Sequence, residues 1–335
     1  MNLNLAGAHI LITGGAGFIG SHIADQALEA GAARVVIIDD FVRGRRENLD
    51  QAIRTGRVEV VVDDICDTAL MERLTERIDI IFHQAALRIT HCAEQPLRAV
   101  QVMIKGTQNV LDAAVRHKVK RVLAASSASV YGEPSYLPMD EAHPFNNRTL
   151  YGALKISNEQ IMRAYAEMYG LQYVAFRPFN VYGPRMDVFG AYTEVMIRWL
   201  QRIATGQRPI IFGDGMQSMD FVYVEDVARA YIQAAVAGVT DDVFNLGSGT
   251  QTSLRDLCRL VCEVSGAGNL QPIFEPARKV NPVTRRQAAI GKARKAIRFE
   301  ASTSLPVGLK ALISWHESIL QEKKGTPLER ELALR

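Results

Sequence analysis

The sequence predicts a doubly wound α/β protein, in which helices cover both faces of a parallel sheet and a smaller α/β domain is attached. Short apolar runs alternate with helix-length amphipathic segments through the first half of the 335-residue chain. The apolar runs are unbroken rather than alternating with polar residues, as in strands that are buried on both faces. The regular succession of the two kinds of segment is typical of βαβ units.

The expected elements follow in order along the chain. We predict strands at 9–13, 34–39, 58–62, 78–83, 121–126 and 172–177, and helices at 18–30, 45–54, 69–77, 97–118 and 150–169. After Gly183 the rhythm breaks, because short apolar runs at 208–213, 220–224 and 242–247 mix with helices and turns. We therefore expect a large domain at 1–182 and a second domain formed mainly by 183–322, which interleaves with the first near 221–250. Residues 323–335 are expected to form a flexible tail.

Composition excludes several classes of protein. Hydrophobic residues make up 48% of the chain, charged residues 22%, and the net charge is +3, which is too balanced to indicate a nucleic-acid partner. The four cysteines and the histidines lack the spacing of metal ligands. The N-terminal residues do not form a signal peptide, and no apolar run is long enough to span a membrane. We expect a cytoplasmic protein without a metal ion or a membrane partner.

A glycine-rich turn between the first strand and the first helix predicts a dinucleotide site. In TGGAGFIG, residues 13–20, Gly14 allows a tight turn, Gly17 lets backbone amides approach a pyrophosphate, and Gly20 lets the helix pack closely on the strand. Asp39 ends the second strand, where a carboxylate can accept hydrogen bonds from both ribose hydroxyls. Together these features predict a Rossmann domain.

Asp39 also favours NAD over NADP, because a carboxylate repels a 2′-phosphate. Arg43 and Arg45 follow it closely and keep NADP open as a minor alternative.

Tyr151 and Lys155 lie one helical turn apart and so share a face of the predicted helix. A tyrosine titrates near ~10 and is a poor base at neutral pH. A nearby ammonium, together with the positive nicotinamide ring, lowers that pKa and lets the phenol exchange a proton with a substrate hydroxyl. Ser126 and Ser127 end the preceding strand, where ligands bind in parallel sheets, so a serine can contact the same hydroxyl.

These residues resemble the extended short-chain dehydrogenase/reductase superfamily, and within it the NAD-dependent nucleotide-sugar epimerases and dehydratases. The resemblance covers nearly the whole chain. Its motifs are TGGAGFIG with the strand-end Asp39, IFHQAA (81–86), ASSASVYG (125–132), YGALK (151–155), RPFNVYGP (177–184), FGDGMQSMDFVYVEDVA (212–228) and VFNLGSG (243–249).

The resemblance implies roles for individual residues. Ser127, Tyr151 and Lys155 would form the catalytic triad. The cofactor site would comprise Gly14, Gly17, Phe18, Ile19, Gly20, Asp39, Asp40, Arg43, Asp64, Ile65, Ala85, Ala86, Ser126, Tyr151 and Lys155. The UDP-sugar would contact Arg88, Ser127, Asn180 and Phe212. Tightly held NAD+ is the implied cofactor, and a homodimer through helices 97–118 and 150–169 is the implied assembly.

The residues after the triad serine indicate the reaction. Dehydratases of this family typically carry an Asp-Glu pair there, and decarboxylases a Glu two positions on, whereas this chain has Ala128 and Ser129. Neither side chain can act as a general acid or base at useful rates. We therefore expect epimerisation at C4 of a UDP-sugar through a transient 4-keto intermediate, with polysaccharide biosynthesis as the setting that similar branches indicate.

Met219 stands where the family often has a diphosphate-binding arginine. Bidentate Arg–phosphate pairing is the usual way to hold such a group. We expect a replacement among four arginines after the second-domain boundary: Arg185, Arg278, Arg285 and Arg286.

The sugar itself stays open. Asn180 favours UDP-glucose and UDP-galactose, because UDP-glucuronate 4-epimerases often have threonine there. UDP-glucuronate and a UDP-N-acetylhexosamine remain alternatives, as do a dehydratase, a dehydrogenase that releases NADH and a non-catalytic NAD-binding protein.

Overall fold

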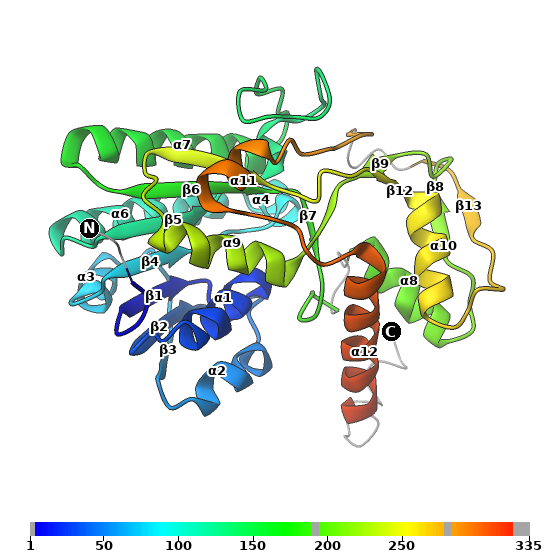
Figure 1. Ribbon diagram of the computed structural model, residues 1–335, viewed down its shortest axis with the longest axis horizontal. Helices are drawn as coiled ribbons and strands as arrows, with labels where there is room; N and C mark the ends of the chain where they lie inside the picture. The colour runs from blue at the N-terminus through cyan, green and yellow to red at the C-terminus, as the bar shows by residue number, and fades with distance from the viewer. Residues whose placement is uncertain (1–3, 189–193, 278–282, 324–335) are drawn as a thin grey trace.

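Seven parallel strands form the centre of the computed structural model, which describes residues 4–188, 194–277 and 283–323 (Figure 1). The order across the sheet is β11-β6-β5-β4-β1-β2-β3, so the chain starts in the middle and works outward in both directions. The strands are β1 (His9–Thr13), β2 (Arg34–Asp39), β3 (Val58–Val62), β4 (Ile80–His83), β5 (Arg121–Ala125), β6 (Tyr173–Pro178) and β11 (Asp242–Leu246). The order changes direction at β1, where open α/β sheets bind their ligands.

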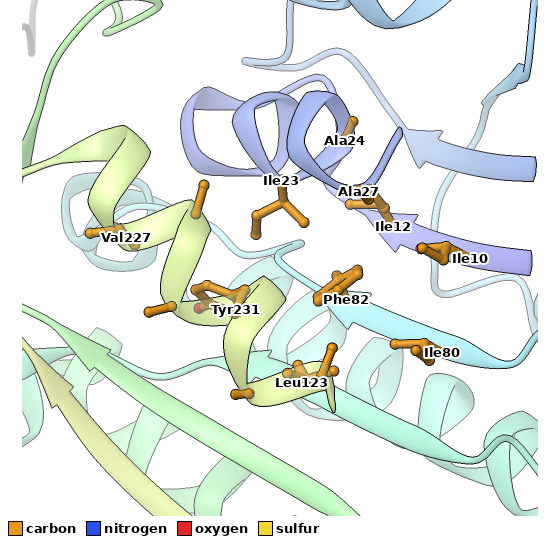
Figure 2. Packing of buried hydrophobic residues seen from close by; sticks show 14 of the residues in the cluster. Ile10, Ile12, Ile23, Ala24, Ala27, Ile80, Phe82, Leu123, Val227 and Tyr231 are labelled. Carbon is orange, nitrogen blue, oxygen red and sulfur yellow. The ribbon is translucent and has the colours of Figure 1, made fainter. Parts of the chain in front are cut away.

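Helices on one face of the sheet enclose the first core. This layer contains α1 (Phe18–Glu29), α2 (Asp50–Arg54), α9 (Val224–Val236) and α11 (Gly291–Ile297). Figure 2 shows Ile23 of α1 and Tyr231 of α9 above the apolar side chains of β1, β4 and β5, among them Phe82. Because both helices bury this face, the strands beneath them carry few polar residues.

The opposite face of the sheet carries a second core. Its helices are α3 (Thr68–Thr75), α6 (Thr107–Arg116) and α7 (Leu150–Tyr169), whereas α4 (Ile89–Glu94) and α5 (Pro96–Val100) pack with α7 in a separate small cluster. Alternate strand residues such as Leu11, Ile38 and Ile81 point into this core. Both faces are therefore buried, which explains the unbroken apolar runs in the sequence.

The predicted helix 97–118 differs in its middle. Between α5 and α6, residues Gln101–Gly106 form a π-helical segment, so one wider turn interrupts the α-helix. A Cβ atom on Gly106 would lie 2.6 Å from Cδ1 of Ile65, so a larger residue would require the Ile65 side chain to move. The expected helix 45–54 likewise divides, into the 3₁₀ turn Arg46–Leu49 and α2.

A smaller group of elements packs beside the carboxyl ends of the strands (Figure 1). It contains three two-stranded sheets and three helices: β7 (Asn180–Tyr182) with β10 (Phe221–Tyr223), β8 (Ile210–Phe212) with β13 (Ile273–Glu275), β9 (Ser218–Met219) with β12 (Thr252–Ser253), α8 (Val195–Ala204), α10 (Leu254–Val264) and α12 (Leu305–Lys323). Trp199, Leu257 and Leu312 are buried in its core.

The segment near 221–250 returns to the main sheet. After β10, helix α9 packs on α1 and β11 pairs with β6 as the outermost parallel strand. The expected tail begins within α12, and residues 324–335 lie outside the described part of the chain. Within that described part, we find no helix with the length and apolar character needed to cross a membrane.

Candidate active site

A cavity of about 630 Å³ opens at the carboxyl ends of the parallel strands. Its lining comes from the glycine-rich turn after β1, the end of β2, the loop after β4, the end of β5, the start of α7 and the chain after β6. These segments are far apart in sequence and meet because parallel strands all end at the same edge of the sheet.

The glycine-rich turn has no room for side chains. Gly14 has φ +66°, and a Cβ atom there would lie 2.7 Å from the backbone nitrogen of Ala85. Gly17 caps α1 without a side-chain hydrogen bond, and the first turn of the helix has no acidic residue. The amides at this end of α1 are therefore available to an anion, which fits the pyrophosphate of a dinucleotide. Phe18, Ile19 and Gly20 line the cavity beside them.

Asp39 is held in place at the end of β2. Its Oδ2 accepts a hydrogen bond from the backbone nitrogen of Ala16 at 2.9 Å, and its Oδ1 accepts one from that of Phe41 at 2.9 Å. Burial raises the pKa of this carboxyl, while the hydrogen bonds from backbone amides oppose the rise. Asp40 and Arg43 also line the cavity, and Arg43 Nη2 forms an ion pair with Asp187 Oδ2 at 2.7 Å.

The remaining predicted cofactor residues also line the cavity: Asp64, Ile65, Ala85, Ala86 and Ser126. Asp64 is ion-paired with Arg98, which helps to hold the pKa of the carboxyl below its ordinary value. The Ser126 hydroxyl donates to the carboxylate of Glu159, so it is already engaged within the protein.

Ser127, Tyr151 and Lys155 lie together in the cavity. Ser127 caps a 3₁₀ turn, Ala128–Val130, and accepts a hydrogen bond from the Ser129 backbone nitrogen at 3.1 Å. Thr149 caps α7 by accepting from the Gly152 amide, which fixes the start of the helix that carries the other two residues. Lys155 Nζ donates to the Ala125 carbonyl at 2.5 Å and lies 5.8 Å from the centre of the Tyr151 ring.

Burial dominates the electrostatics of both titratable groups. It lowers the pKa of Lys155 to about 8. Burial raises the pKa of Tyr151, although the hydrogen bond from Ser127 and the charges of Arg88 and Arg286 oppose this. The expected lowering of the tyrosine pKa is therefore not supplied by the protein's own groups, because Tyr151 is more buried than a helix-surface pair would be.

Three of the predicted substrate arginines line the cavity, in different states. Arg88 is ion-paired with Glu194, and Arg185 Nη1 with Asp25 Oδ2 at 2.7 Å. Arg286 differs, because it forms no ion pair among the described residues, and its buried Nε has no hydrogen-bond partner there. Burial lowers the pKa of Arg286, and the charges of Glu133 and Tyr151 oppose this.

Of the other predicted substrate residues that the structure describes, some line the cavity and others do not. Asn180 lines the cavity and donates through Nδ2 to the Asp220 carbonyl at 3.1 Å. Phe212 and Arg285 are absent from the lining, and the exposed Arg285 instead donates to Gln251 at 3.2 Å. Arg278 lies outside the described residues.

Several cavity residues were not predicted from the sequence. Gln84, Phe179, Met186, Met196 and Leu254 all line it. Gln84 directly follows β4 and precedes the predicted Ala85, so its position at a strand end could have identified it. Met196 and Leu254 lie in the first turns of α8 and α10 in the smaller group of elements, and no local pattern indicates that these helix starts face the cavity.

The model of the NAD dependent epimerase/dehydratase family matches residues 10–247. The chain belongs to this family. The match spans most of the sheet and every residue of the Ser127, Tyr151 and Lys155 group. The predicted family, the Rossmann-type α/β fold and the NAD cofactor are thereby confirmed.

Relatives within the epimerase/dehydratase family differ in their reactions. A UDP-glucose 4-epimerase from Mycolicibacterium smegmatis is 34% identical over 91% of this chain and 97% of its own. A UDP-N-acetyl-alpha-D-glucosaminuronate decarboxylase from Bacillus cytotoxicus is 31% identical over 92% of this chain and 98% of its own. The crystal structure of a UDP-glucose 4-epimerase from Thermotoga maritima with UDP-glucose superimposes with a TM-score of 0.87, at 33% identity over 93% of this chain and 99% of that one. Similarity of this level supports a nucleotide-sugar enzyme and leaves the sugar open.

Proposed function

We propose that the protein is an NAD-dependent 4-epimerase of UDP-sugars, with UDP-glucose and UDP-galactose as the favoured pair. One observation carries this proposal. Ser127, Tyr151 and Lys155 share one cavity with the glycine-rich turn, while Ala128 and Ser129 beside the serine carry no acid or base. Such a site can oxidise and reduce one carbon, but it lacks at these positions the groups needed to eliminate water.

Each catalytic residue has a defined role in this reaction. Bound NAD supplies the hydride acceptor and donor. Tyr151 takes the proton of the sugar 4-hydroxyl as that carbon is oxidised and returns a proton to the oxygen when the keto group is reduced. Ser127 hydrogen-bonds the same oxygen, and the Lys155 ammonium favours the phenolate form of Tyr151. The cavity of about 630 Å³ gives the keto sugar space to present its other face.

Arg286 is the arginine that we propose to hold the anionic part of the substrate. A buried guanidinium Nε without a hydrogen-bond partner is unfavourable, so an anion that accepts from it would be strongly bound. Arg185 and Arg88 already have carboxylate partners and would have to exchange them. In this proposal, Arg286 takes the place of the diphosphate-binding arginine that the family often has at the position of Met219.

A second candidate substrate is a UDP-hexuronate, and Arg286 is again the reason. Its charge acts on Tyr151, so it lies near the reacting end of the sugar as well as within the cavity. A carboxylate on C5 of the sugar would satisfy it there. The relative that acts on a glucosaminuronate shows that acidic sugars occur among proteins of this similarity.

We also propose a homodimer formed by α5, α6 and α7. Four apolar side chains on α5 and at the end of α7 are exposed in the single chain: Leu97 (81%), Val100 (44%), Met168 (64%) and Tyr169 (54%). Apolar surface of this kind is typical of protein–protein interfaces. Sedimentation equilibrium of the purified protein would give twice the chain mass; a monomer at micromolar concentration contradicts this assembly.

Incubation with separate nucleotide-sugars tests the function. UDP-glucose, UDP-glucuronate and UDP-N-acetylglucosamine are each mixed with the purified protein, and inversion at C4 is followed by ¹H NMR. The proposal predicts inversion of UDP-glucose without accumulation of NADH. Inversion of UDP-glucuronate alone supports the second candidate. A growing absorbance at 340 nm would indicate a dehydrogenase, and no inversion of any sugar by NAD-loaded protein contradicts an epimerase.

A further inference from the structure

A buried ion pair lies next to Ser126 and outside the lining of the cavity. Arg177 on β6 donates to both carboxylate oxygens of Glu159 on α7, through Nε at 2.9 Å and Nη2 at 2.6 Å. Their side chains are 3% and 6% exposed. Neither residue lines the cavity, and neither was predicted as a site residue from the sequence. Burying two charges is unfavourable unless their remaining polar atoms are also satisfied.

Hydrogen bonds from four further segments fix the position of this pair. Arg177 Nη1 donates to the Tyr131 hydroxyl at 2.8 Å and to the Glu141 carbonyl at 3.1 Å. The Tyr131 hydroxyl in turn donates to Asn245 Oδ1 on β11 at 2.6 Å. On the other side, the Ser126 hydroxyl at the end of β5 donates to Glu159. The carboxylate of Glu159 therefore has little freedom to move.

Glu159 lies one helical turn beyond Lys155 and faces the same strand end. Lys155 holds the Ala125 carbonyl, and Glu159 holds the hydroxyl of the next residue, Ser126. The two side chains thus attach α7 to adjacent residues of β5. This arrangement places a fixed carboxylate one helical turn from an ammonium that is itself buried, and opposite charges favour the ionised form of each other.

The other titratable groups that act on Lys155 do not supply this charge. They are Cys92 on α4, His83 on β4 and Tyr151 on α7. Burial raises the pKa of Cys92 and of Tyr151, so both are neutral at neutral pH, and it lowers the pKa of His83 to about 3, so the imidazole is neutral as well. Glu159 raises the pKa of Lys155 against the effect of burial.

We propose that Glu159, fixed by Arg177 and Ser126, is a positioning residue that keeps Lys155 protonated at the active site. The ion pair has this electrostatic role in addition to any contribution to stability. Its link to turnover rests on the proposed function, because Lys155 favours the phenolate form of Tyr151 only while it is charged. Its effect on the protonation of Lys155 does not depend on which substrate the protein uses.

The first test measures Lys155 directly, without substrate. The free energy of urea unfolding is compared between chains with Lys155 and with Lys155→Met at several pH values from 6 to 9.5. The difference changes with pH only where Lys155 titrates differently in the folded and unfolded chain, so it reports the folded pKa. In the Glu159→Gln background we expect this pKa to fall by about one to two units.

A double variant keeps the test interpretable if the Glu159→Gln single variant misfolds. Glu159→Gln leaves the Arg177 guanidinium buried without a counter-charge, whereas Glu159→Gln with Arg177→Met removes both charges together. Arg177 is not among the groups that shift the pKa of Lys155, so the double variant should show the same fall. Glu167→Gln is the matched control, because Glu167 is an exposed residue of the same helix and its replacement should leave the pKa unchanged.

The second test follows turnover against pH. In the double variant the loss of activity at high pH should begin about one to two units lower than in the wild-type protein, so activity at pH 8.5 falls roughly tenfold relative to that at pH 7. Absence of any turnover in the wild-type protein would contradict the proposed function but leave the unfolding test intact. An unchanged Lys155 pKa in the double variant would overturn the inference, even if the variant were less stable.

Discussion

Arg286 and Tyr151 line the same cavity, where burial raises the pKa of the phenol and the charge of the guanidinium opposes that rise. Arg286 comes from the segment that follows β13 and Tyr151 from α7, so the fold brings together two side chains that are distant in sequence. The buried Nε of Arg286 has no partner among the described residues. We propose that Arg286 binds an anionic group of the substrate at this position.

Replacing Arg286 by alanine should weaken UDP binding at least tenfold if the diphosphate is its partner, since charge-assisted hydrogen bonds are each worth about 1.5–3 kcal/mol. Isothermal titration with UDP measures this. If the partner is a sugar carboxylate, affinity for UDP stays unchanged and only affinity for UDP-glucuronate falls. Arg285→Ala is the matched control, because Arg285 is exposed and lies outside the cavity lining. An equal loss in both variants contradicts a specific role for Arg286.

Tyr151→Phe should lower kcat by about 10²–10⁴-fold, the usual contribution of a general acid–base group. The bound NAD content and the melting temperature should change little, because only a hydroxyl is lost. The coupled assay for UDP-galactose formation gives the rate, and absorbance after denaturation gives the NAD content. Retention of more than about a tenth of the activity would show that another group moves the proton.

Gly14→Ala should abolish NAD retention, whereas Gly56→Ala should not. Both glycines have a positive φ, +66° and +70°, so alanine costs about 1–2 kcal/mol of backbone strain at either position. Only at Gly14 would the added Cβ also meet backbone, 2.7 Å from the nitrogen of Ala85. The NAD content of each purified variant distinguishes the two effects. Equal NAD content in both variants would contradict a cofactor role for the turn.

Lys155→Met should stabilise the NAD-free protein at neutral pH while removing activity. Burial lowers the pKa of Lys155 from 10.5 to about 8, so the unfolded chain binds more protons than the folded one between these values. Stability therefore rises with pH across that window and is most reduced below it. The penalty relieved by methionine is about 3 kcal/mol at pH 7 and about half of that at pH 9.5, less the lost hydrogen bond to Ala125. Urea unfolding at the two pH values measures it, and a destabilised variant at pH 7 contradicts it.

The core of the fold could be predicted because its signals are local. Strands such as 9–13 and 58–62 have the predicted bounds, and α7 begins and ends where expected, at Leu150 and Tyr169. The wider turn at Gln101–Gly106 could not be predicted, because it coincides with the close approach of Ile65, a residue distant in sequence.

In the candidate site too, local sequence patterns could be predicted and contacts between distant residues could not. The glycine-rich turn and the Tyr151–Lys155 pair are short patterns with fixed spacing. By contrast, the pairing of Arg177 with Glu159, and of Arg185 with Asp25, joins residues on separate elements, and only the folded chain shows which arginines are already engaged. Of the three described candidates, Arg185 is ion-paired, Arg285 is exposed and only Arg286 has a buried Nε and no ion pair, which sequence alone does not reveal.

Inversion at C4 of UDP-glucose is the most direct test of the proposed 4-epimerase activity. The NAD-loaded protein is incubated with UDP-glucose, and the ¹H NMR signals of both C4 epimers are followed together with absorbance at 340 nm. A 4-epimerase should form UDP-galactose until the two sugars reach equilibrium, while no NADH accumulates. Stoichiometric NADH would contradict the proposed 4-epimerase activity. An unchanged spectrum for UDP-glucose, UDP-glucuronate and UDP-N-acetylglucosamine alike would also contradict it.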